Sequence, residues 1–547
     1  MTFNRQDKYP YRKSFKLKSA QGARMDSITS KEKFNRNSLY LILGFSLFEL
    51  LLHLYTNAFA GYGYFRDELY YTACSNHPAA GYVDQPPLSA YILFISIKVF
   101  GKSLFALRFL PAIVSAITVF IIGLITRKLN GRYTAITLAC IAVALAPIFL
   151  GTGTFYSMNI FDWLFWALAY YIVILIINSF QTGTEVDKKL WIWLGIVLGL
   201  GLLNKISLLW FGAGLLIGLI LTPQRKYLRT PWPYFTGIIA FVIFSPYIIW
   251  NITHNFATLE FIHNASALKY SSQNPGTFIN DTFQSLNPVS SILWIAGIFF
   301  LFFHREGKVY RLAGYIFLIV FIILIINFHS KAEYISPAFP ILYAAGAVMV
   351  EKITLHKGFG WIRFALPSLL TLSGLIIAPL ALPVLPVEQY IKYSKALGKR
   401  PSSQESQKLE ELPQFYADMF GWENMAATIS KVYTSLPPEE QKEAVVFGQN
   451  YGEAGAIDFF RGKYPLPPAV SAHNNYWFWG YGDTTRKILI VIGSNVKDNL
   501  QWFDSVRQVG EIKSNYAMPY ETNIIITICQ KPKYPYNFFW HKLKFFI

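Results

Sequence analysis

Long apolar runs alternate with short polar segments between residues 38 and 383. Eleven of these runs approach the length of a helix that crosses a bilayer, about 17–25 residues. The shorter ones require tilt or local thinning of the membrane. The pattern predicts a polytopic α-helical membrane protein with about eleven transmembrane helices over residues 38–383. The runs are Leu39–Ala60, 104–126, 134–150, 159–178, 190–204, 207–222, 233–250, 288–303, 312–328, 335–351 and 361–383.

One further apolar run, Leu88–Phe100, is shorter than a transmembrane helix needs to be. It lies in a predicted first outer loop of residues 61–103, so we expect a juxtamembrane or re-entrant helix there. Aromatic residues, which favour a bilayer–water interface, are frequent in the same loop. We therefore expect the loop to lie on the membrane surface.

The apolar runs end at residue 383, and residues 384–547 are largely polar. A helical pattern covers Lys408–Ser435, and Pro437 marks a new helix start. Short apolar stretches then indicate buried strands. They are Val445–Phe447, Ile488–Ile492 and Ile524–Ile528. The segment has the size of a typical domain and is predicted to be a soluble α/β domain, whose basic and aromatic tail, Lys531–Ile547, is expected to lie on the membrane.

Lys and Arg residues are unevenly distributed between the loops. The net charge of +18 would suggest a nucleic-acid partner in a soluble protein, but 53% of the residues are hydrophobic. The excess falls on alternate loops and on a flexible basic tail of residues 1–37, as the positive-inside rule requires of cytoplasmic segments. We therefore expect a cytoplasmic N-terminus, an extracytoplasmic C-terminal domain, contact with the bilayer and no nucleic-acid partner.

Ionisable and polar side chains at the ends of the predicted spans gather on the outer side of the membrane. Charges in such places are costly and usually functional, and side chains that only reach for water would occur on both sides. The residues are Arg66, Asp67, Glu68, Asp84 and Gln85 in the first outer loop, Asn159 and Asp162 at the fourth span, Lys205 between two runs, and Lys331, Glu333 and Tyr334 before the tenth span.

These residue types suit the transfer of a group from a lipid-linked phosphate. A cation beside apolar helices can hold the phosphate through charge-assisted hydrogen bonds, and a carboxylate can take a proton from an attacking hydroxyl. Two neighbouring carboxylates can instead hold a divalent metal ion, for which Asp67 and Asp162 are the candidates.

Structural roles are open for the same side chains. Lys205 can be a side chain at a helix end that reaches for the interface, and Asp162 can be a helix N-cap. Lys331 and Tyr334 can be interface anchors.

The order of these motifs resembles that of the GT-C fold membrane glycosyltransferases, in particular the bacterial glycosyltransferase family 39-like group. That group is related to protein O-mannosyltransferases and to the aminoarabinose transferases that modify lipid A. The resemblance covers most of the chain and continues into the outer domain. It rests on Arg66-Asp67-Glu68, Asp84-Gln85-Pro86-Pro87-Leu88, Asn159 with Asp162, Gly199–Lys205, Lys331 with Tyr334, and Asn450–Phe460.

The resemblance implies a hexosyl- or pentosyltransferase of the bacterial plasma membrane. Its co-substrate would be a polyprenyl-phosphate-linked sugar, transferred on the outer face with inversion to a lipid, glycan or protein acceptor. Asp67, Glu68 and Asp162 would be the catalytic acids, with Asp67 as the general base or the residue that orients the acceptor. The donor phosphate and substrate would be bound by Arg66, Asp84, Gln85, Asn159, Lys205, Lys331 and Tyr334.

One position departs from the family pattern. Aminoarabinose transferases have a Lys before the Pro-Pro pair of the first outer loop, where this chain has Gln85. The departure puts lipid A modification with aminoarabinose in doubt. No cofactor is certain from the sequence; a divalent metal is one expectation.

Two other classes of protein fit parts of the pattern. A transporter or a flippase for lipid-linked sugars would carry paired broken helices and an inverted repeat; the sequence has one interruption, at Asn204-Lys205, and no repeat. A non-catalytic surface assembly protein would not need the acidic first loop. The glycosyltransferase hypothesis accounts for more of the residues.

Overall fold

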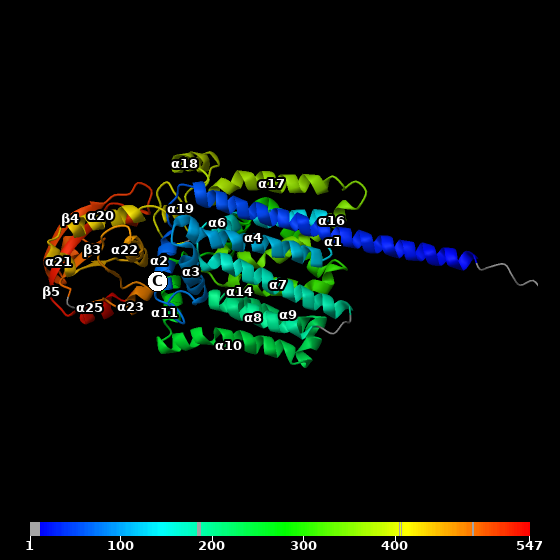
Figure 1. Cartoon of the computed structure of the whole chain (residues 1–547), viewed down its shortest axis with the longest axis horizontal. Coiled ribbons are helices and arrows are strands. Elements are labelled where there is room, and N and C mark those ends of the chain that lie inside the picture. The colour runs from blue at the N-terminus through cyan, green and yellow to red at the C-terminus, as the bar shows by residue number, and fades with distance from the viewer. Residues whose placement is uncertain (1–10, 183–186, 404, 406, 484–485) are drawn as a thin grey trace, which may run out of the picture.

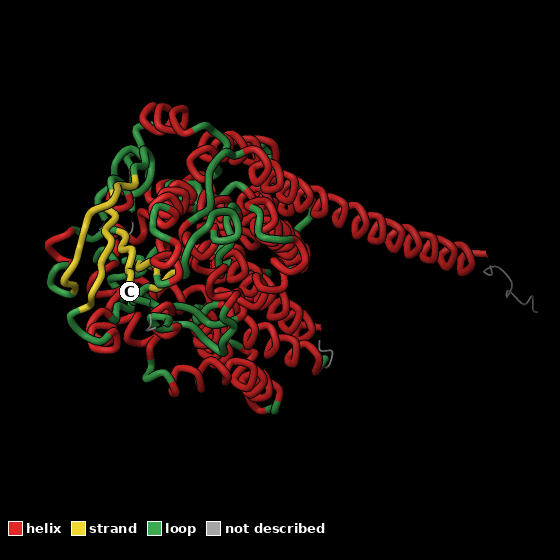
Figure 2. Tube along the Cα trace, turned by 60° about the vertical axis from the view of Figure 1, so that its left-hand side comes forward, coloured by secondary structure: helices red, strands yellow, loops and turns green. Residues whose placement is uncertain are grey.

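The computed structural model describes residues 11–182, 187–403, 405, 407–483 and 486–547. It consists of a helical bundle and a smaller α/β domain packed against one end of the bundle (Figure 1). The strands gather on the side away from the bundle, and the N-terminal helix extends out of it at the opposite end (Figure 2).

The bundle contains a helix, or a bent pair of helices, at each of the eleven predicted apolar runs. Its helices are α1 (Tyr11–Phe59), α4 (Leu104–Lys128), α5 (Tyr133–Ala144), α6 (Pro147–Gly153), α7 (Met158–Thr182), α8 (Lys188–Asn204), α9 (Leu208–Leu221), α10 (Trp232–Thr253), α13 (Ser291–Phe302), α14 (Arg311–Ile326), α16 (Pro340–Thr354) and α17 (Ile362–Ala381). The chain is therefore a multi-pass α-helical protein, as the hydrophobic pattern predicts.

The number of spans depends on how bent helices are counted. Among the described residues, 6 helices are long and apolar enough to cross a membrane, or up to 10 if each bent pair is one span. The remaining predicted run is α8, which has 17 residues and is about 25 Å long at 1.5 Å per residue. That length falls short of a typical hydrocarbon core, so the count of eleven stays a prediction.

Helix α1 corrects the prediction of a flexible tail over residues 1–37. The helix begins at Tyr11 and continues without a break into the first span. Residues 12–37 contain no proline and are rich in Lys, Arg and Ser, and of these Lys and Arg are good helix formers. The part of the predicted tail before Tyr11 lies outside the described residues.

Short helices cover the end of the bundle that faces the α/β domain. Helix α3 spans Leu88–Phe100, as the sequence predicts, and α2 spans Arg66–Asn76 in the same loop. Both lie between the bundle and the α/β domain (Figure 1). The others, which the pattern does not reveal, are α11 (Ala257–Asn264), the π-helical turn η2 (Ala265–Lys269), α12 (Pro275–Ser285) and α15 (Ala332–Ile335). The 3₁₀ turns are η1 (Pro223–Arg229), η3 (Pro288–Ser290), η4 (Gly307–Tyr310), η5 (Ser336–Ala338) and η6 (Pro519–Glu521).

The C-terminal domain is built on a five-stranded sheet with the order β2-β1-β3-β5-β4. Strands β2, β1 and β3 are parallel, and β5 and β4 are antiparallel to their neighbours. All five residues of β3 are buried, so its unbroken apolar run reads as a central strand. The strands are β1 (Ala444–Phe447), β2 (Ala469–Val470), β3 (Ile488–Ile492), β4 (Phe503–Ile512) and β5 (Ile524–Pro532).

The helices of this domain differ in part from prediction. The predicted helix Lys408–Ser435 is two helices, α19 (Gln414–Ala417) and α20 (Trp422–Thr434), because Pro413 precedes the first and Gly421, at φ +94°, separates them. The predicted start at Pro437 is correct. The remaining helices are α18 (Val387–Ala396), α21 (Pro438–Lys442), α22 (Tyr451–Phe460), α23 (Asn475–Trp479), α24 (Val496–Asn499) and α25 (Tyr536–Leu543).

The C-terminal tail fastens the domain to the bundle. Trp540 of α25 is buried and exchanges two hydrogen bonds with Trp477 of α23. Beyond α25, Lys544 forms an ion pair of 2.8 Å with Glu260 of α11, and the C-terminus lies between the two parts of the molecule (Figure 1). The tail therefore packs on the protein, and its contact with the membrane stays a prediction.

Candidate active site

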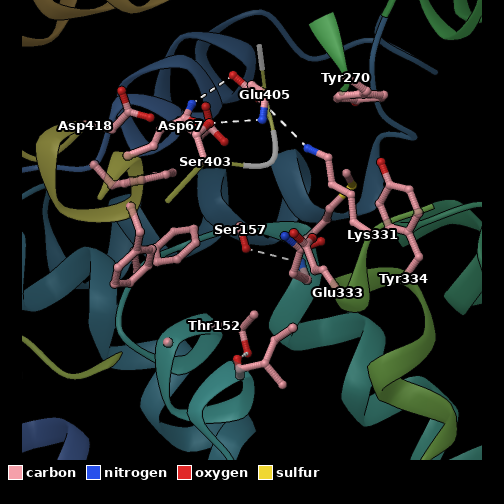
Figure 3. A pocket seen from close by; sticks show the side chains of 18 of the residues that line it. Asp67, Thr152, Ser157, Tyr270, Lys331, Glu333, Tyr334, Ser403, Glu405 and Asp418 are labelled. Carbon is pink, nitrogen blue, oxygen red and sulfur yellow. Dashed lines mark hydrogen bonds and ion pairs between the residues drawn. The ribbon is translucent and has the colours of Figure 1, made fainter. Parts of the chain in front are cut away.

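A cavity of about 780 Å³ lies where the bundle meets the α/β domain. Its walls include parts of α2, α6, the start of α7, the break between α8 and α9, the segment around α15, and residues 399–403, 405 and 413–418 of the domain. Figure 3 shows acidic and cationic side chains from these elements pointing into one space. The predicted site residues that line the cavity are Arg66, Asp67, Asp84, Asn159, Lys205, Lys331 and Tyr334.

Asp67 lies in the first turn of α2, and its side chain is 34% exposed. Its Oδ1 accepts a hydrogen bond of 2.9 Å from the hydroxyl of Tyr451 and lies 3.8 Å from Nε of Arg66. An anionic side chain is favoured at this end of a helix. Asp67 is thus an ionisable group held at the cavity wall with access to its interior.

Glu68 does not line the cavity. Successive residues of a helix point about 100° apart, and Glu68 faces the protein interior with 0% exposure. Its two oxygens accept hydrogen bonds of 3.0 and 2.9 Å from the guanidinium of Arg108, and others from the backbone N–H groups of Phe65 and Tyr156. Glu68 therefore joins the first outer loop to α4.

Lys205 is held at the break between α8 and α9. Lys205 follows the last residue of α8 and has an extended backbone, so its side chain does not continue the line of side chains along that helix. The ammonium donates to Oδ1 of Asn159 at 2.7 Å and lies 3.5 Å from Glu333 and 4.0 Å from Asp162. Its side chain is 9% exposed, and it lies over the ring of Tyr334 at 5.4 Å. The result is a cation fixed at the base of the cavity.

Asp162 lies behind this cation and does not line the cavity. It is 0% exposed, and its Oδ1 accepts a hydrogen bond of 2.6 Å from Ser207. Because Asp162 is the nearest acid behind Lys205, it balances the ammonium's charge and fixes its position.

A second set of cations, Lys269 and Lys331, lies around Glu405 of the C-terminal domain. Nζ of Lys269 lies 3.5 Å from Oε1 of Glu405, and Nζ of Lys331 lies 4.0 Å from the same oxygen. Lys331 also lies over the ring of Tyr270, at 4.1 Å. Burial would raise the pKa of Glu405, but Lys269, Arg66 and Lys331 outweigh it and lower the pKa to about 2. Glu405 is therefore a permanent anion within a cluster of cations, of which Figure 3 shows Lys331.

The two neighbours Asp84 and Gln85 have different surroundings. Asp84 lines the cavity and accepts a hydrogen bond of 2.9 Å from the hydroxyl of Tyr70. Burial raises the pKa of Asp84 to about 6, although the bond from Tyr70 opposes the rise. Gln85 is 1% exposed and contacts Ser89 and Cys74. It is therefore part of the loop's interior.

Arg66 lines the cavity, but its guanidinium is already engaged. It donates to the hydroxyl of Tyr520 at 2.6 Å and lies 3.7 Å from Asp418, both in the outer domain. The guanidinium carbon also lies over the ring of Tyr451, 5.3 Å from its centroid. Arg66 thus joins α2 to the outer domain at the cavity wall.

Comparison with known proteins agrees with this architecture. Residues 84–250 match the model of a family described as dolichyl-phosphate-mannose-protein mannosyltransferase. The matched range contains Asp84, Asn159, Asp162 and Lys205. No curated protein sequence matches the chain.

Among solved structures, the chain is similar to ArnT from Cupriavidus metallidurans. With ArnT bound to undecaprenyl phosphate the TM-score is 0.54 at 13% identity, over 89% of this chain and 97% of that chain. The apo state gives 0.56 at 12% identity, over 89% and 98%. The arabinofuranosyltransferase AftD from Mycobacteria gives 0.51 at 11% identity, over 90% of this chain and 40% of that chain. The chain has the GT-C fold.

The GT-C fold was predicted from motifs in the first outer loop and at the span ends, and it is confirmed together with the multi-pass architecture. The side chains that line the cavity without having been predicted include Lys269, Tyr270, Glu405 and Tyr451. Lys269 and Tyr270 come from the turn after α11, Glu405 from an irregular segment and Tyr451 from the start of α22. Lys269 was visible only as a charge in an outer loop, and no pattern marks Glu405.

The residues present do not fit a metal ion held jointly by Asp67 and Asp162. Asp67 is engaged by Tyr451, whereas Asp162 is paired with Ser207 and with the cation Lys205, which would repel a metal. Within the described part of the chain, no group of three or more His, Cys, Asp or Glu side chains is arranged to hold a metal ion.

Proposed function

We propose that this protein is an integral membrane glycosyltransferase that moves a sugar from a polyprenyl-phosphate-linked donor to an acceptor on the extracytoplasmic face. One observation carries the proposal: the accessible carboxylate of Asp67 and the buried cation of Lys205 line the same cavity, between an apolar bundle and a polar domain. The match to a mannosyltransferase family over residues 84–250 supports it, as does the GT-C fold, which is shared with an ArnT structure that contains undecaprenyl phosphate.

The donor's phosphate would lie against Lys205, with Lys331 and Lys269 nearby. Negative charge develops on the phosphate as the sugar leaves, and fixed cations in a partly buried site stabilise that charge. Side chains of α6 and α17 supply an apolar wall beside them, including Ile148 and Leu380. Such a wall suits the polyprenyl chain.

The acceptor would approach from the side of Asp67. Its hydroxyl oxygen attacks the anomeric carbon while its proton passes to the Asp67 carboxylate. The bond between the anomeric carbon and the phosphate oxygen breaks, and polyprenyl phosphate leaves with the electron pair. Attack opposite the leaving group inverts the anomeric centre. If the acceptor is itself a phosphate, it needs no base, and Asp67 orients it instead.

The topology follows from the same proposal. Lys and Arg residues in alternate loops favour a cytoplasmic N-terminus, which places the cavity and the C-terminal domain outside, in a bacterial plasma membrane. The transferred group is a hexose or a pentose, and the acceptor is a lipid, a glycan or a protein.

Transfer in proteoliposomes tests the proposal. Purified protein is given a panel of polyprenyl-phosphate sugars and a panel of lipid, oligosaccharide and peptide acceptors, and released polyprenyl phosphate is measured. We expect release by the wild type and a loss of about 10²-fold or more in Asp67→Asn, because a general base contributes about that much. The matched control is Asp504→Asn, which changes an exposed acid of β4 and should leave release unchanged.

Two results would contradict the proposal. Transport of intact lipid-linked sugar across the bilayer, without release from any donor, would favour a flippase. Release by the wild type with full activity in Asp67→Asn would keep the glycosyltransferase but remove Asp67 from the role of base.

A further inference from the structure

Tyr451 connects the outer domain to the candidate base. It is the first residue of α22 and is 6% exposed. Its hydroxyl donates a hydrogen bond of 2.9 Å to Oδ1 of Asp67, which lies 384 positions earlier in the chain. Both side chains line the cavity. The C-terminal domain therefore reaches the group that the proposed reaction uses.

The ring of Tyr451 is held on several sides. It packs on Tyr70 with ring centroids 4.6 Å apart, and the Arg66 guanidinium lies 5.3 Å from its centroid. Its backbone N–H donates to Nδ1 of His473 at 3.3 Å, and Nε2 of His473 contacts the carbonyl of Ile547 at 3.0 Å.

The protonation state of His473 agrees with these contacts. Burial lowers the pKa of His473 to about 3, so the ring is neutral at physiological pH. A neutral imidazole has one acceptor and one donor nitrogen, which here are Nδ1 and Nε2–H. Nδ1 thereby accepts from the start of α22, while Nε2–H holds the ring to Ile547.

Two glycines let α22 approach α2 closely enough for this contact. A Cβ at Gly452 would lie 2.7 Å from Cγ of Arg66, and one at Gly455 would lie 3.2 Å from the backbone of Leu69. Asn450 caps the helix, since its Oδ1 accepts from the N–H groups of Gly452 and Glu453. The close packing and the cap together set the position of the Tyr451 hydroxyl relative to Asp67.

We propose that Tyr451 is a positioning residue of the reaction, which fixes the Asp67 carboxylate through Oδ1 and leaves Oδ2 to face the acceptor. The inference rests on the proposed function. Within the described part of the chain, Oδ2 of Asp67 has no hydrogen-bond partner. The outer domain is then part of the reaction centre, in addition to any part it has in choosing the acceptor.

A role of Tyr451 in packing alone and a role as a hydrogen-bond donor predict different effects of Tyr451→Phe on the carboxylate. A hydrogen bond to the ionised form of an acid lowers its pKa, and loss of the bond raises it. The charged groups that face the pair are Arg66 of α2, Asp84 of the first outer loop, and Glu405 and Asp418 of the outer domain. These remain in Tyr451→Phe, so a change in titration is due to the lost hydroxyl.

The test compares Tyr451→Phe with Tyr476→Phe. Tyr476 is buried in the same domain and donates a hydrogen bond of 2.8 Å to Asp458. Neither Tyr476 nor Asp458 lines the cavity. In Tyr451→Phe we expect kcat to fall about 10-fold or more, since a hydrogen bond to a charged group has about that worth. KM for the donor should be unchanged, and the acid limb of the pH–rate profile should move to higher pH. Tyr476→Phe lowers thermal stability without these effects.

A second measurement does not depend on turnover. A carbodiimide with an amine nucleophile labels protonated carboxyl groups, and mass spectrometry gives the labelled fraction of Asp67 at each pH. The midpoint should lie at higher pH in Tyr451→Phe than in the wild type or in Tyr476→Phe. An unchanged midpoint, or equal changes in kcat for the two variants, would overturn the role of Tyr451. Absence of transfer by the wild type from every donor would overturn the proposed function instead, while the labelling still decides whether the hydroxyl controls the carboxylate.

Discussion

Arg108 of α4 binds Glu68 of α2 through two hydrogen bonds, Nε to Oε1 at 3.0 Å and Nη2 to Oε2 at 2.9 Å. Both side chains are almost fully buried. Arg108 also donates to the carbonyl of Gly63 at 2.8 Å. The pair holds the first outer loop against the bundle, and in doing so turns the neighbouring Asp67 toward the cavity.

This arrangement predicts opposite consequences for two adjacent acids. Glu68→Ala leaves the Arg108 charge buried and unpaired, which typically costs about 3–5 kcal/mol. We expect a large fall in the thermal unfolding temperature of the purified protein. Asp67→Asn should lose transfer while it keeps its unfolding temperature. A Glu68→Ala protein as stable as the wild type would contradict the structural role.

Lys205 is predicted to act on the donor. Lys205→Met removes the cation that Asn159, Asp162 and Glu333 hold in place. Loss of one preorganised group that stabilises developing charge costs about 10²–10³ in rate. We expect kcat/KM for the donor to fall by that order. Lys497→Met, on the exposed surface of α24, is the matched control, and similar rates in the two variants would remove Lys205 from the site.

Glu405 is predicted to compete with the donor's phosphate for the same cations. In Glu405→Gln, Lys269 and Lys331 lose their carboxylate partner, so KM for the donor should fall. The pKa of Glu405 is about 2, below the usual value of about 4.3, so its ion pairs persist as pH falls and are lost only near pH 2. The change in KM should therefore be the same throughout pH 5–8. A higher KM in Glu405→Gln would show that the carboxylate helps to hold the substrate.

The raised pKa of Asp84 predicts that the stability of the folded protein depends on pH. Burial raises its pKa to about 6 in the folded protein, whereas an unfolded chain has about 3.9. The folded state therefore binds the proton more tightly, and Asp84 favours folding most below about pH 4 and least above pH 6. Thermal unfolding of the wild type and Asp84→Asn across this range measures it. The stability of the wild type relative to Asp84→Asn should decline between pH 4 and pH 6, and a constant difference would contradict the shift.

The hydrophobic pattern predicted much of the architecture. Leu88–Phe100 and Ile488–Ile492 form a helix and a strand with the predicted bounds, because an apolar run of given length has few ways to hide its surface. The predicted helix Lys408–Ser435 was wrong before Pro413 and again between Ala417 and Trp422, where Gly421 adopts a left-handed backbone conformation.

The sequence alone determined that the chain crosses a membrane several times, that an α/β domain follows the spans, and that acids and cations gather at span ends. Only the tertiary structure decided where these side chains point and what they contact. It directed Asp67 into the cavity and Glu68 into an ion pair with Arg108, and it brought Glu405 and Tyr451 to the site from the distant domain. The reason is physical. Span length and charge bias are local properties of a segment, whereas the direction of a side chain depends on partners that only folding brings within reach.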